Sequence, residues 1–192
     1  MNADTATHKR RLRARTRQAR SALSEAELLA ARDKLTARLQ ALVQQHDARS
    51  VSCFLPVRGE PDTTQFIDWA LASGIDVLLP CSRPDGLIDW VRPNGDGTVT
   101  GAFGVPEPVG EVLGPLGADG IDLMLIPAAA VDTRGSRLGW GRGYFDRNLA
   151  SLAHRPPVFA VVYESEVLDQ LPIEPHDVPL QGVVTPERTL RF

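Results

Sequence analysis

Glycine and arginine are concentrated in residues 132–146, Asp-Thr-Arg-Gly-Ser-Arg-Leu-Gly-Trp-Gly-Arg-Gly-Tyr-Phe-Asp. Glycines lack a side chain, so the backbone there can turn tightly and bring its N–H groups close to a ligand. Arginines supply forked donors that match phosphate and carboxylate groups. A helix predicted to begin at Tyr144 adds unpaired N–H groups and the positive end of its dipole. The stretch therefore predicts an anion site at a strand-to-helix turn. Its glycines are Gly135, Gly139, Gly141 and Gly143, and its arginines are Arg134, Arg137 and Arg142.

Two better-known phosphate loops do not fit this stretch. No Gly-Lys-Ser/Thr ends it, so it is not a Walker A loop, and Gly139-x-Gly141-x-Gly143 has the wrong spacing for the dinucleotide motif Gly-x-Gly-x-x-Gly. A flexible loop with solvated arginines is the simpler interpretation. Three arginines followed by Asp146 exceed what a linker needs, and this favours a phosphate site.

Apolar runs around this stretch predict the elements that hold it. Residues 121–127 read as a buried strand before the loop, and a helix is expected from Tyr144 to about Ala153. A strand at 51–56, a helix capped by Thr63 or Thr64 and ended by Gly74, and a strand at 75–80 form a βαβ unit, which implies a parallel sheet. Further predicted elements are a capping box at 24–27 that opens an amphipathic core helix, strands at 87–91, 157–163 and 182–185, a helix at 164–171, and an irregular excursion at 93–120 that could contain a hairpin.

The loop at residues 57–62 follows the strand predicted at 51–56. Ligands in open α/β sheets bind beyond the carboxyl ends of strands, so Glu60 is well placed to contact one. A solvated loop glutamate is the alternative. Trp90 and Phe103 could stack on a flat ring, although core packing is the expected role of each.

Length and composition predict one globular domain, 1–192, with a sizeable core: 192 residues are 43% hydrophobic and 23% charged. No apolar run approaches the ~20 residues of a membrane span, and no apolar segment after the basic N-terminus predicts a secretory signal. The two cysteines, Cys53 and Cys81, are expected to be buried thiols, which indicates a reducing, cytoplasmic location.

Residues 8–20 are strongly basic, and they follow residues 1–7, which are expected to be frayed. The segment holds seven of the 21 Lys and Arg residues and no acidic residue, on a chain with 24 Asp and Glu. Its composition favours a helix. The residues alone leave open a nucleic-acid or membrane arm, a transit peptide, a helix that lends cations to a nucleotide, and a solvated basic face.

Residues 137–146, Arg-Leu-Gly-Trp-Gly-Arg-Gly-Tyr-Phe-Asp, resemble the Arg-Leu-Gly-x-Gly-x-Gly-Tyr-Tyr-Asp signature of the 5-formyltetrahydrofolate cyclo-ligase family. Three further blocks follow the family in the right order: Lys9-Arg-Arg-Leu-Arg13, Glu60-Pro-Asp-Thr63 with Leu55 before it, and the segment 176–185 with Asp177. Two departures concern the pocket, since Phe145 lacks the hydroxyl of the family's second tyrosine and Val131 stands where phenylalanine is common.

The resemblance implies a three-layer α/β/α domain with a mainly parallel sheet, Rossmann-like and of the NagB/RpiA/CoA-transferase kind. It implies a cytoplasmic, monomeric ligase that uses ATP and Mg²⁺ to cyclise 5-formyltetrahydrofolate to 5,10-methenyltetrahydrofolate, with small-molecule partners and neither nucleic acid nor membrane. Arg137, Arg142 and Tyr144 are the expected catalytic residues, and Asp146 and Asp177 the expected metal ligands. Asp177 also fits a local turn. The expected ATP contacts are Lys9, Arg13 and residues 137–145, which comprise Arg137, Leu138, Gly139, Trp140, Gly141, Arg142, Gly143, Tyr144 and Phe145. The expected folate contacts are Leu55, Glu60, Trp140, Gly141, Arg142, Gly143 and Tyr144.

Two other functions remain open at this point. A non-catalytic regulator on the same scaffold would bind folate or nucleotide without turnover. A nucleic-acid-binding protein would use residues 8–20 and bind with strong salt dependence, but the acidic remainder of the chain argues against it.

Overall fold

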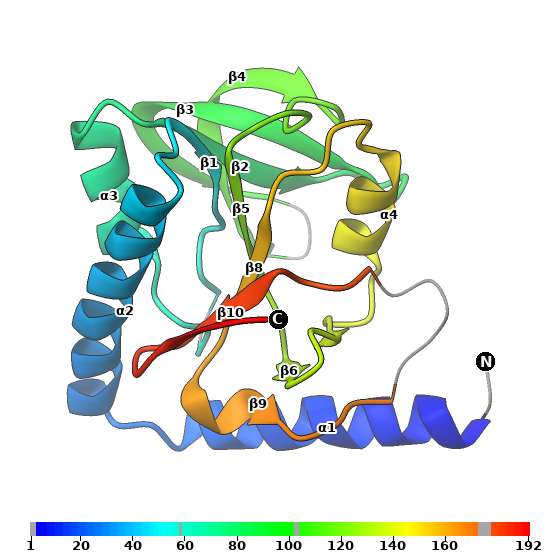
Figure 1. Cartoon of the computed structure of the whole chain (residues 1–192). Coiled ribbons are helices and arrows are strands. Elements are labelled where there is room, and N and C mark those ends of the chain that lie inside the picture. Colours follow the sequence, from blue (N-terminus) through cyan, green and yellow to red (C-terminus); the bar gives the residue numbers. More distant parts are fainter. Residues whose placement is uncertain (1–2, 58, 102–103, 173–177) are drawn as a thin grey trace.

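A twisted sheet of eight strands forms the centre of the molecule, in the order β11-β10-β8-β5-β1-β2-β3-β4 (Figure 1). The computed structural model describes residues 3–57, 59–101, 104–172 and 178–192. The five neighbouring strands from β10 to β2 are parallel, and the edges are antiparallel. The parallel strands are β1 (Ser50–Ser52), β2 (Asp76–Ser82), β5 (Leu123–Pro127), β8 (Val158–Val161) and β10 (Gly182–Val184), and the antiparallel ones are β3 (Ile88–Thr100), β4 (Pro106–Gly114) and β11 (Thr189–Arg191).

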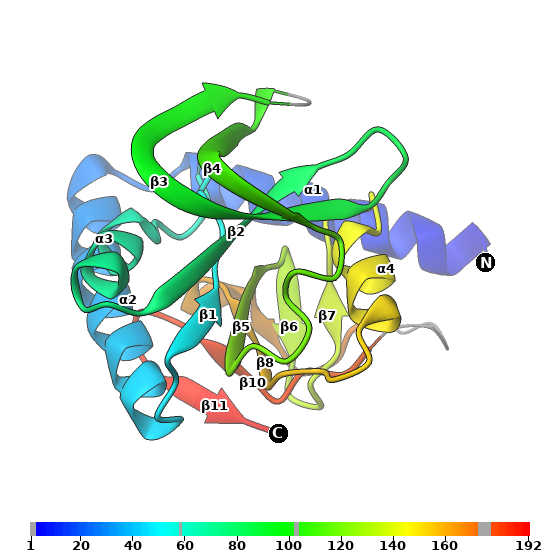
Figure 2. The same cartoon turned by 90° about the horizontal axis from the view of Figure 1, so that it is seen from above.

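Alternation along the buried strands divides the core into two layers. In β5, Leu123 and Leu125 pack in one cluster, whereas Met124 and Ile126 pack in the other. Successive side chains of a strand point to opposite faces, so both faces need a cover. The helices α2 (Glu25–Gln45) and α3 (Thr64–Ala72) cover one face, and α4 (Tyr144–Ser151) covers the other (Figures 1 and 2). This confirms the predicted three-layer α/β/α fold with a mainly parallel sheet.

The basic segment is helical, as predicted, but its helix α1 (Ala3–Ser21) begins earlier than expected. Residues 3–7, expected to be frayed, form its first turns, where Asp4 suits the positive end of the helix dipole. The helix runs along one side of the molecule beside β6 and β9 (Figure 1). It docks just beyond the end of β5, because Thr16 Oγ1 donates to the carbonyl of Ala129 at 3.0 Å and Arg20 Nη2 to that of Ala128 at 2.9 Å.

A second, three-stranded sheet supports the glycine-rich stretch. Its strand β6 (Ala130–Asp132) pairs antiparallel with β7 (Arg137–Leu138) and parallel with β9 (Val167–Leu168). The helix predicted at 164–171 is therefore wrong. Only one 3₁₀ turn, η2 (Glu164–Glu166), is helical, because Glu166 turns inward to a buried partner and the next two residues join β6. Tertiary pairing overrides the local preference here.

Residues 93–120 are more regular than predicted. Strands β3 and β4 form a long antiparallel hairpin with register shifts near Trp90 and between Pro93 and Thr98. Trp90 is fully buried in the core, as expected, and Phe103 lies outside the described residues. Within the described ranges, no helix combines the length and apolar character needed to cross a membrane.

Candidate active site

A cavity of about 980 Å³ lies beyond the carboxyl ends of the parallel strands, where open α/β sheets bind ligands. Its walls come from the end of α1, the loop after β1, the end of β2 and the glycine-rich stretch before α4. Most residues predicted for the site line it. These are Leu55, Glu60, Arg137, Gly139, Trp140, Arg142, Gly143, Tyr144, Phe145 and Asp146.

Residues 139–143 form the bare part of the wall. Gly141 has a φ of +97°, and a Cβ there would lie 3.3 Å from the guanidinium carbon of Arg13. Gly143 is left-handed and caps α4. Gly139 differs, because its φ is not left-handed and an added Cβ would meet no described atom within 4 Å. Its backbone is therefore open toward the cavity that it lines.

Arg137 and Asp146 form an ion pair inside the cavity wall. Arg137 is 6% exposed, donates from Nη1 to the carbonyl of Val178 at 3.0 Å, and donates from Nη2 to Asp146 Oδ1. Strand β7 fixes Arg137 and the first turn of α4 fixes Asp146, so two short elements set the pair. The carboxylate is one-third exposed. A partly exposed carboxylate on the cavity wall could bind Mg²⁺, which keeps several of its waters and takes one or two carboxylates. Among the described residues, no group of three His, Cys, Asp or Glu side chains could enclose an ion.

The start of α4 is anchored to the turn between β2 and β3. Tyr144 donates its hydroxyl to the carbonyl of Arg83 at 2.8 Å. Arg147 stacks over the Tyr144 ring at 5.4 Å and donates to the carbonyls of Gly86 and Arg142. Phe145 packs edge-on against Trp90, with 6.5 Å between the ring centres. The loop therefore enters the helix at a fixed position.

Glu60 forms the opposite wall, and it is buried rather than solvated. Its Oε2 accepts from the N–H of Val57 at 3.2 Å, and its Oε1 lies 3.9 Å from Arg20 Nη1. Burial raises the pKa of this carboxyl, against the opposing effects of the Val57 N–H, Arg20 and the Trp140 indole. The indole nitrogen nevertheless meets no full hydrogen-bond geometry with any described group. Leu55 packs beside this wall at the edge of the core.

The N-terminal helix reaches the glycine-rich stretch through Arg13, one of the two predicted ATP contacts on this helix. Arg13 Nε donates to the carbonyl of Gly139 at 2.7 Å. Lys9 is buried on the same face of α1, at 8% exposure. Neither residue is among the described residues that line the cavity itself.

The cavity residues that the sequence analysis did not predict include two cations, Arg17 and Arg20, near the end of α1. Both guanidinium groups lie over the Trp140 ring, at 5.2 and 5.0 Å. A signal for Arg20 did exist, because positions 9, 13, 16 and 20 share one helical face and three of these four polar residues are buried. Polar side chains on a buried helical face need hydrogen-bond or ionic partners elsewhere in the protein, because burying them without partners is costly.

Besides Lys9 and Arg13, three predicted contacts lie apart from the cavity or outside the described residues. Leu138 packs in a small core cluster, and Gly141 faces Arg13. Arg134, of the same stretch, is exposed. Asp177, the second expected metal ligand, lies outside the described residues.

The cavity thus has two chemically different ends. One offers guanidinium groups, bare backbone and a carboxylate, and these suit a phosphate chain with its cation. The other offers a buried carboxylate and apolar side chains, and these suit a flat ring with N–H donors. A ligand pair that meets between the two ends could exchange a phosphoryl group.

Comparison with known proteins identifies relatives of the whole chain. The model of the 5-formyltetrahydrofolate cyclo-ligase family matches residues 5–186. The 5-formyltetrahydrofolate cyclo-ligase of Mycolicibacterium smegmatis is 39% identical over 145 residues, which cover 73% of this chain and 75% of that protein. The protein of the same name from Haemophilus influenzae is 28% identical over 93% of this chain and 98% of its own length. The solved structure of the 5,10-methenyltetrahydrofolate synthetase of Aquifex aeolicus superimposes with a TM-score of 0.80 at 30% identity, and covers 95% of this chain and 92% of its own.

Proposed function

Because the chain belongs to the 5-formyltetrahydrofolate cyclo-ligase family of enzymes, we propose that it converts 5-formyltetrahydrofolate and ATP into 5,10-methenyltetrahydrofolate, ADP and phosphate. The γ-phosphoryl group moves from ATP to the formyl oxygen, which gives an iminium phosphate. The 10-nitrogen of the folate then attacks the former formyl carbon and loses its proton to water. Closure of the five-membered ring breaks the bond between that carbon and the phosphorylated oxygen and expels phosphate.

The residues suit this chemistry because phosphoryl transfer needs positioning and charge neutralisation more than a protein nucleophile. In the proposal, Arg137, Arg142 and the backbone of residues 139–143 hold the phosphates, and Lys9 and Arg13 act from α1. Glu60 and Leu55 hold the folate. Tyr144, at the joint between the loop and α4, faces both ligands. Trp140 and Phe145 complete the nucleotide wall.

A bound Mg²⁺ would neutralise phosphate charge during the transfer. Asp146 is a described residue suited to hold it, since it lines the cavity and its carboxylate is one-third exposed. Asp177 is proposed as its partner by resemblance alone. Cys53 and Cys81 are unpaired thiols, which supports a cytoplasmic location.

The observation that carries the proposal is the single cavity that the glycine-rich stretch and Glu60 share. The test is Arg137→Ala, which should lower ATP-dependent methenyl formation at least about 100-fold, since it removes a preorganised donor to transferring phosphate. The readout is the rise in near-ultraviolet absorbance of the product, with ADP release measured in parallel.

Arg134→Ala is the matched control, because Arg134 is exposed in the same stretch and lies outside the cavity. It should keep the rate of the parent protein. Wild-type-like turnover in Arg137→Ala would reject the phosphate assignment. Binding of both ligands by the parent protein without ADP release would instead identify a non-catalytic regulator.

A further inference from the structure

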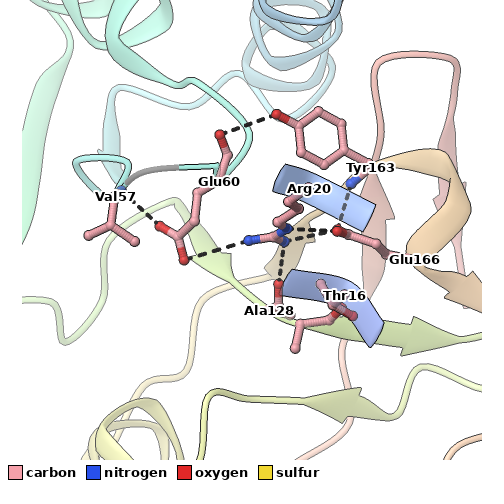
Figure 3. Close-up of polar contacts among 8 residues, drawn as sticks. Thr16, Arg20, Val57, Glu60, Ala128, Tyr163 and Glu166 are labelled. Carbon is pink, nitrogen blue, oxygen red and sulfur yellow. Dashed lines mark hydrogen bonds and ion pairs between the residues drawn. The ribbon is translucent and has the colours of Figure 1, made fainter. Parts of the chain in front are cut away.

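A buried guanidinium at the last turn of α1 contacts three other segments of the chain: the residue after β5, the turn after β8 and the loop of Glu60. Arg20 is 6% exposed and grips Glu166 with two arms, Nε to Oε1 at 2.7 Å and Nη2 to Oε2 at 2.9 Å (Figure 3). The Nη2 atom also donates to the carbonyl of Ala128, beyond the end of β5. Glu166 in turn accepts from the N–H of Tyr163 at 2.9 Å and is 4% exposed. The pair is therefore a fixed and almost completely buried unit.

This unit holds the Glu60 loop by its backbone and by its charge. The Tyr163 hydroxyl donates to the carbonyl of Glu60 at 3.3 Å, and Arg20 Nη1 stands 3.9 Å from the Glu60 carboxylate (Figure 3). Because Glu166 and Ala128 engage two of the three guanidinium nitrogens, Glu60 is approached only by the third, at more than hydrogen-bond distance. The positive charge of Arg20 therefore acts on Glu60 Oε1, and this oxygen can still accept a hydrogen bond from a ligand.

The charges here are unequal, with two buried carboxylates around one guanidinium. Burial raises the pKa of Glu60, Arg20 opposes that rise and Glu166 adds to it. The same environment raises the pKa of Tyr163 to about 12, so its hydroxyl remains a donor at neutral pH. The described charged or titratable groups around Glu60 are Arg17 and Arg20 from α1, Tyr163 and Glu166 from the segment after β8, Asp62 from its own loop and Glu25 from α2.

We propose that Arg20 is a positioning residue of the reaction: through its grip on Glu166 it fixes the loop of Glu60 and keeps that carboxylate ionised and able to accept hydrogen bonds from the folate ring. The inference rests on the proposed folate role of Glu60. It assigns the end of α1 to the folate side of the cavity, whereas Lys9 and Arg13 serve the nucleotide side.

The test is the pH dependence of KM for 5-formyltetrahydrofolate in four proteins: the parent, Glu60→Gln, Arg20→Met and Glu166→Gln. In the parent, affinity should fall at low pH as Glu60 becomes protonated, so that KM rises. We call this rise the acid limb of the pH profile, and Glu60→Gln should lack it. Arg20→Met removes the supporting cation, so its limb should move to higher pH, with KM about tenfold higher at neutral pH. Glu166→Gln removes a competing anion, so its limb should move to lower pH. Any titration of the ligands themselves is the same for all four proteins, so it cannot produce a difference between their limbs.

Opposite shifts from the two halves of one ion pair distinguish positioning from mere structural damage, which would lower kcat and the melting temperature of both without moving the limb. Arg20→Lys keeps the charge and should return the limb toward the parent position. Asp76→Asn is the matched control. It removes one carboxylate from the two-armed pair of Arg92 with Asp76, at 2.6 and 2.9 Å, outside the cavity, and should move no limb.

Three results separate the failures. A folded Arg20→Met with the parent's limb, or shifts of one sign in both variants, would overturn the positioning role. If Arg20→Met does not fold, the result for Glu166→Gln decides alone. A limb in that variant that stays in place or moves to higher pH would overturn the positioning role. Unchanged KM and pH profile in Glu60→Gln would instead refute the folate role of Glu60 itself.

Discussion

At the scale of single residues, Gly139 stands apart from the other glycines of its stretch. Gly141 and Gly143 need a left-handed backbone, so a side chain there strains the fold whatever the ligand does. Gly139 has no such need, and no described atom would touch its added methyl group. In the proposed function, a nucleotide that approaches this backbone would account for the absence of a side chain here.

Gly139→Ala should therefore separate stability from activity. Loss of backbone freedom in the unfolded chain should leave the free energy of unfolding unchanged or raise it by about 0.4–1 kcal/mol. The methyl group should meanwhile raise KM for ATP about tenfold or more, because it occupies space at the phosphate wall. Denaturant unfolding and steady-state kinetics measure the two effects. Gly141→Ala, by comparison, should lower both the free energy of unfolding and the affinity for ATP. A Gly139→Ala protein with normal KM for ATP would contradict close approach of the nucleotide to this backbone.

Arg137 and Asp146 show a second property of the site. The cation proposed for phosphate and the carboxylate proposed for metal neutralise each other across the wall. A buried guanidinium without a partner would be costly, and Asp146 is a counter-ion for it within the fold. In the proposed function, phosphate would take the place of the carboxylate beside Arg137, and Mg²⁺ would take the place of the guanidinium beside Asp146.

At the scale of elements, α1 docks through polar groups rather than through an apolar stripe. Ala129 is the junction, because its N–H donates to the carbonyl of Leu138 and its carbonyl accepts from Thr16. The loop after β5 thereby touches the helix on one side and the glycine-rich stretch on the other. The geometry of the nucleotide wall then depends on how firmly α1 is seated.

Thr16→Val tests that dependence with almost no change of shape. The carbonyl of Ala129 loses its donor in a buried place, so the free energy of unfolding should fall by about 1–3 kcal/mol. Amide exchange in α1 should accelerate more than exchange in the central strands, and KM for ATP should rise. Thr98→Val, at an exposed position of β3, should stay within about 0.5 kcal/mol. Equal acceleration of exchange throughout the molecule would mean that α1 is not a separately seated element.

The elements also show what the sequence could and could not predict. Apolar runs such as 121–127 identify buried strands because burial on both faces requires them. The glycine-rich stretch and Glu60 were predicted from local composition and from the rule for strand ends. The pair of Arg20 and Glu166 was not, since its members are 146 residues apart and each alone resembles a solvated charge. The same pair explains the wrong helix at 164–171, where an inward carboxylate and pairing with β6 replaced a plausible helical pattern.

At the scale of the whole molecule, the cavity is lined by segments that are far apart in the sequence, from α1 to the start of α4. Arg20 belongs to the first helix, Glu60 to the loop after β1, and Arg137 to the second half of the sequence. None of these segments can hold its site geometry alone, because each depends on contacts with the others. Ligands that bind all of them should therefore stabilise the fold as one unit.

Saturation with 5-formyltetrahydrofolate and a non-hydrolysable ATP analogue should raise the melting temperature in one cooperative transition. At 100 times Kd, one ligand stabilises by about 2.7 kcal/mol, which corresponds to roughly 5–10 °C for a chain of this size. The two ligands together should give at least the sum of their separate shifts, because both contact the glycine-rich stretch. Arg137→Ala should lose the nucleotide shift and keep the folate shift, and Glu60→Gln should do the reverse. If each ligand raised the melting temperature of Arg137→Ala and of Glu60→Gln by the same amount, the two ends of the cavity would not hold the ligands assigned to them.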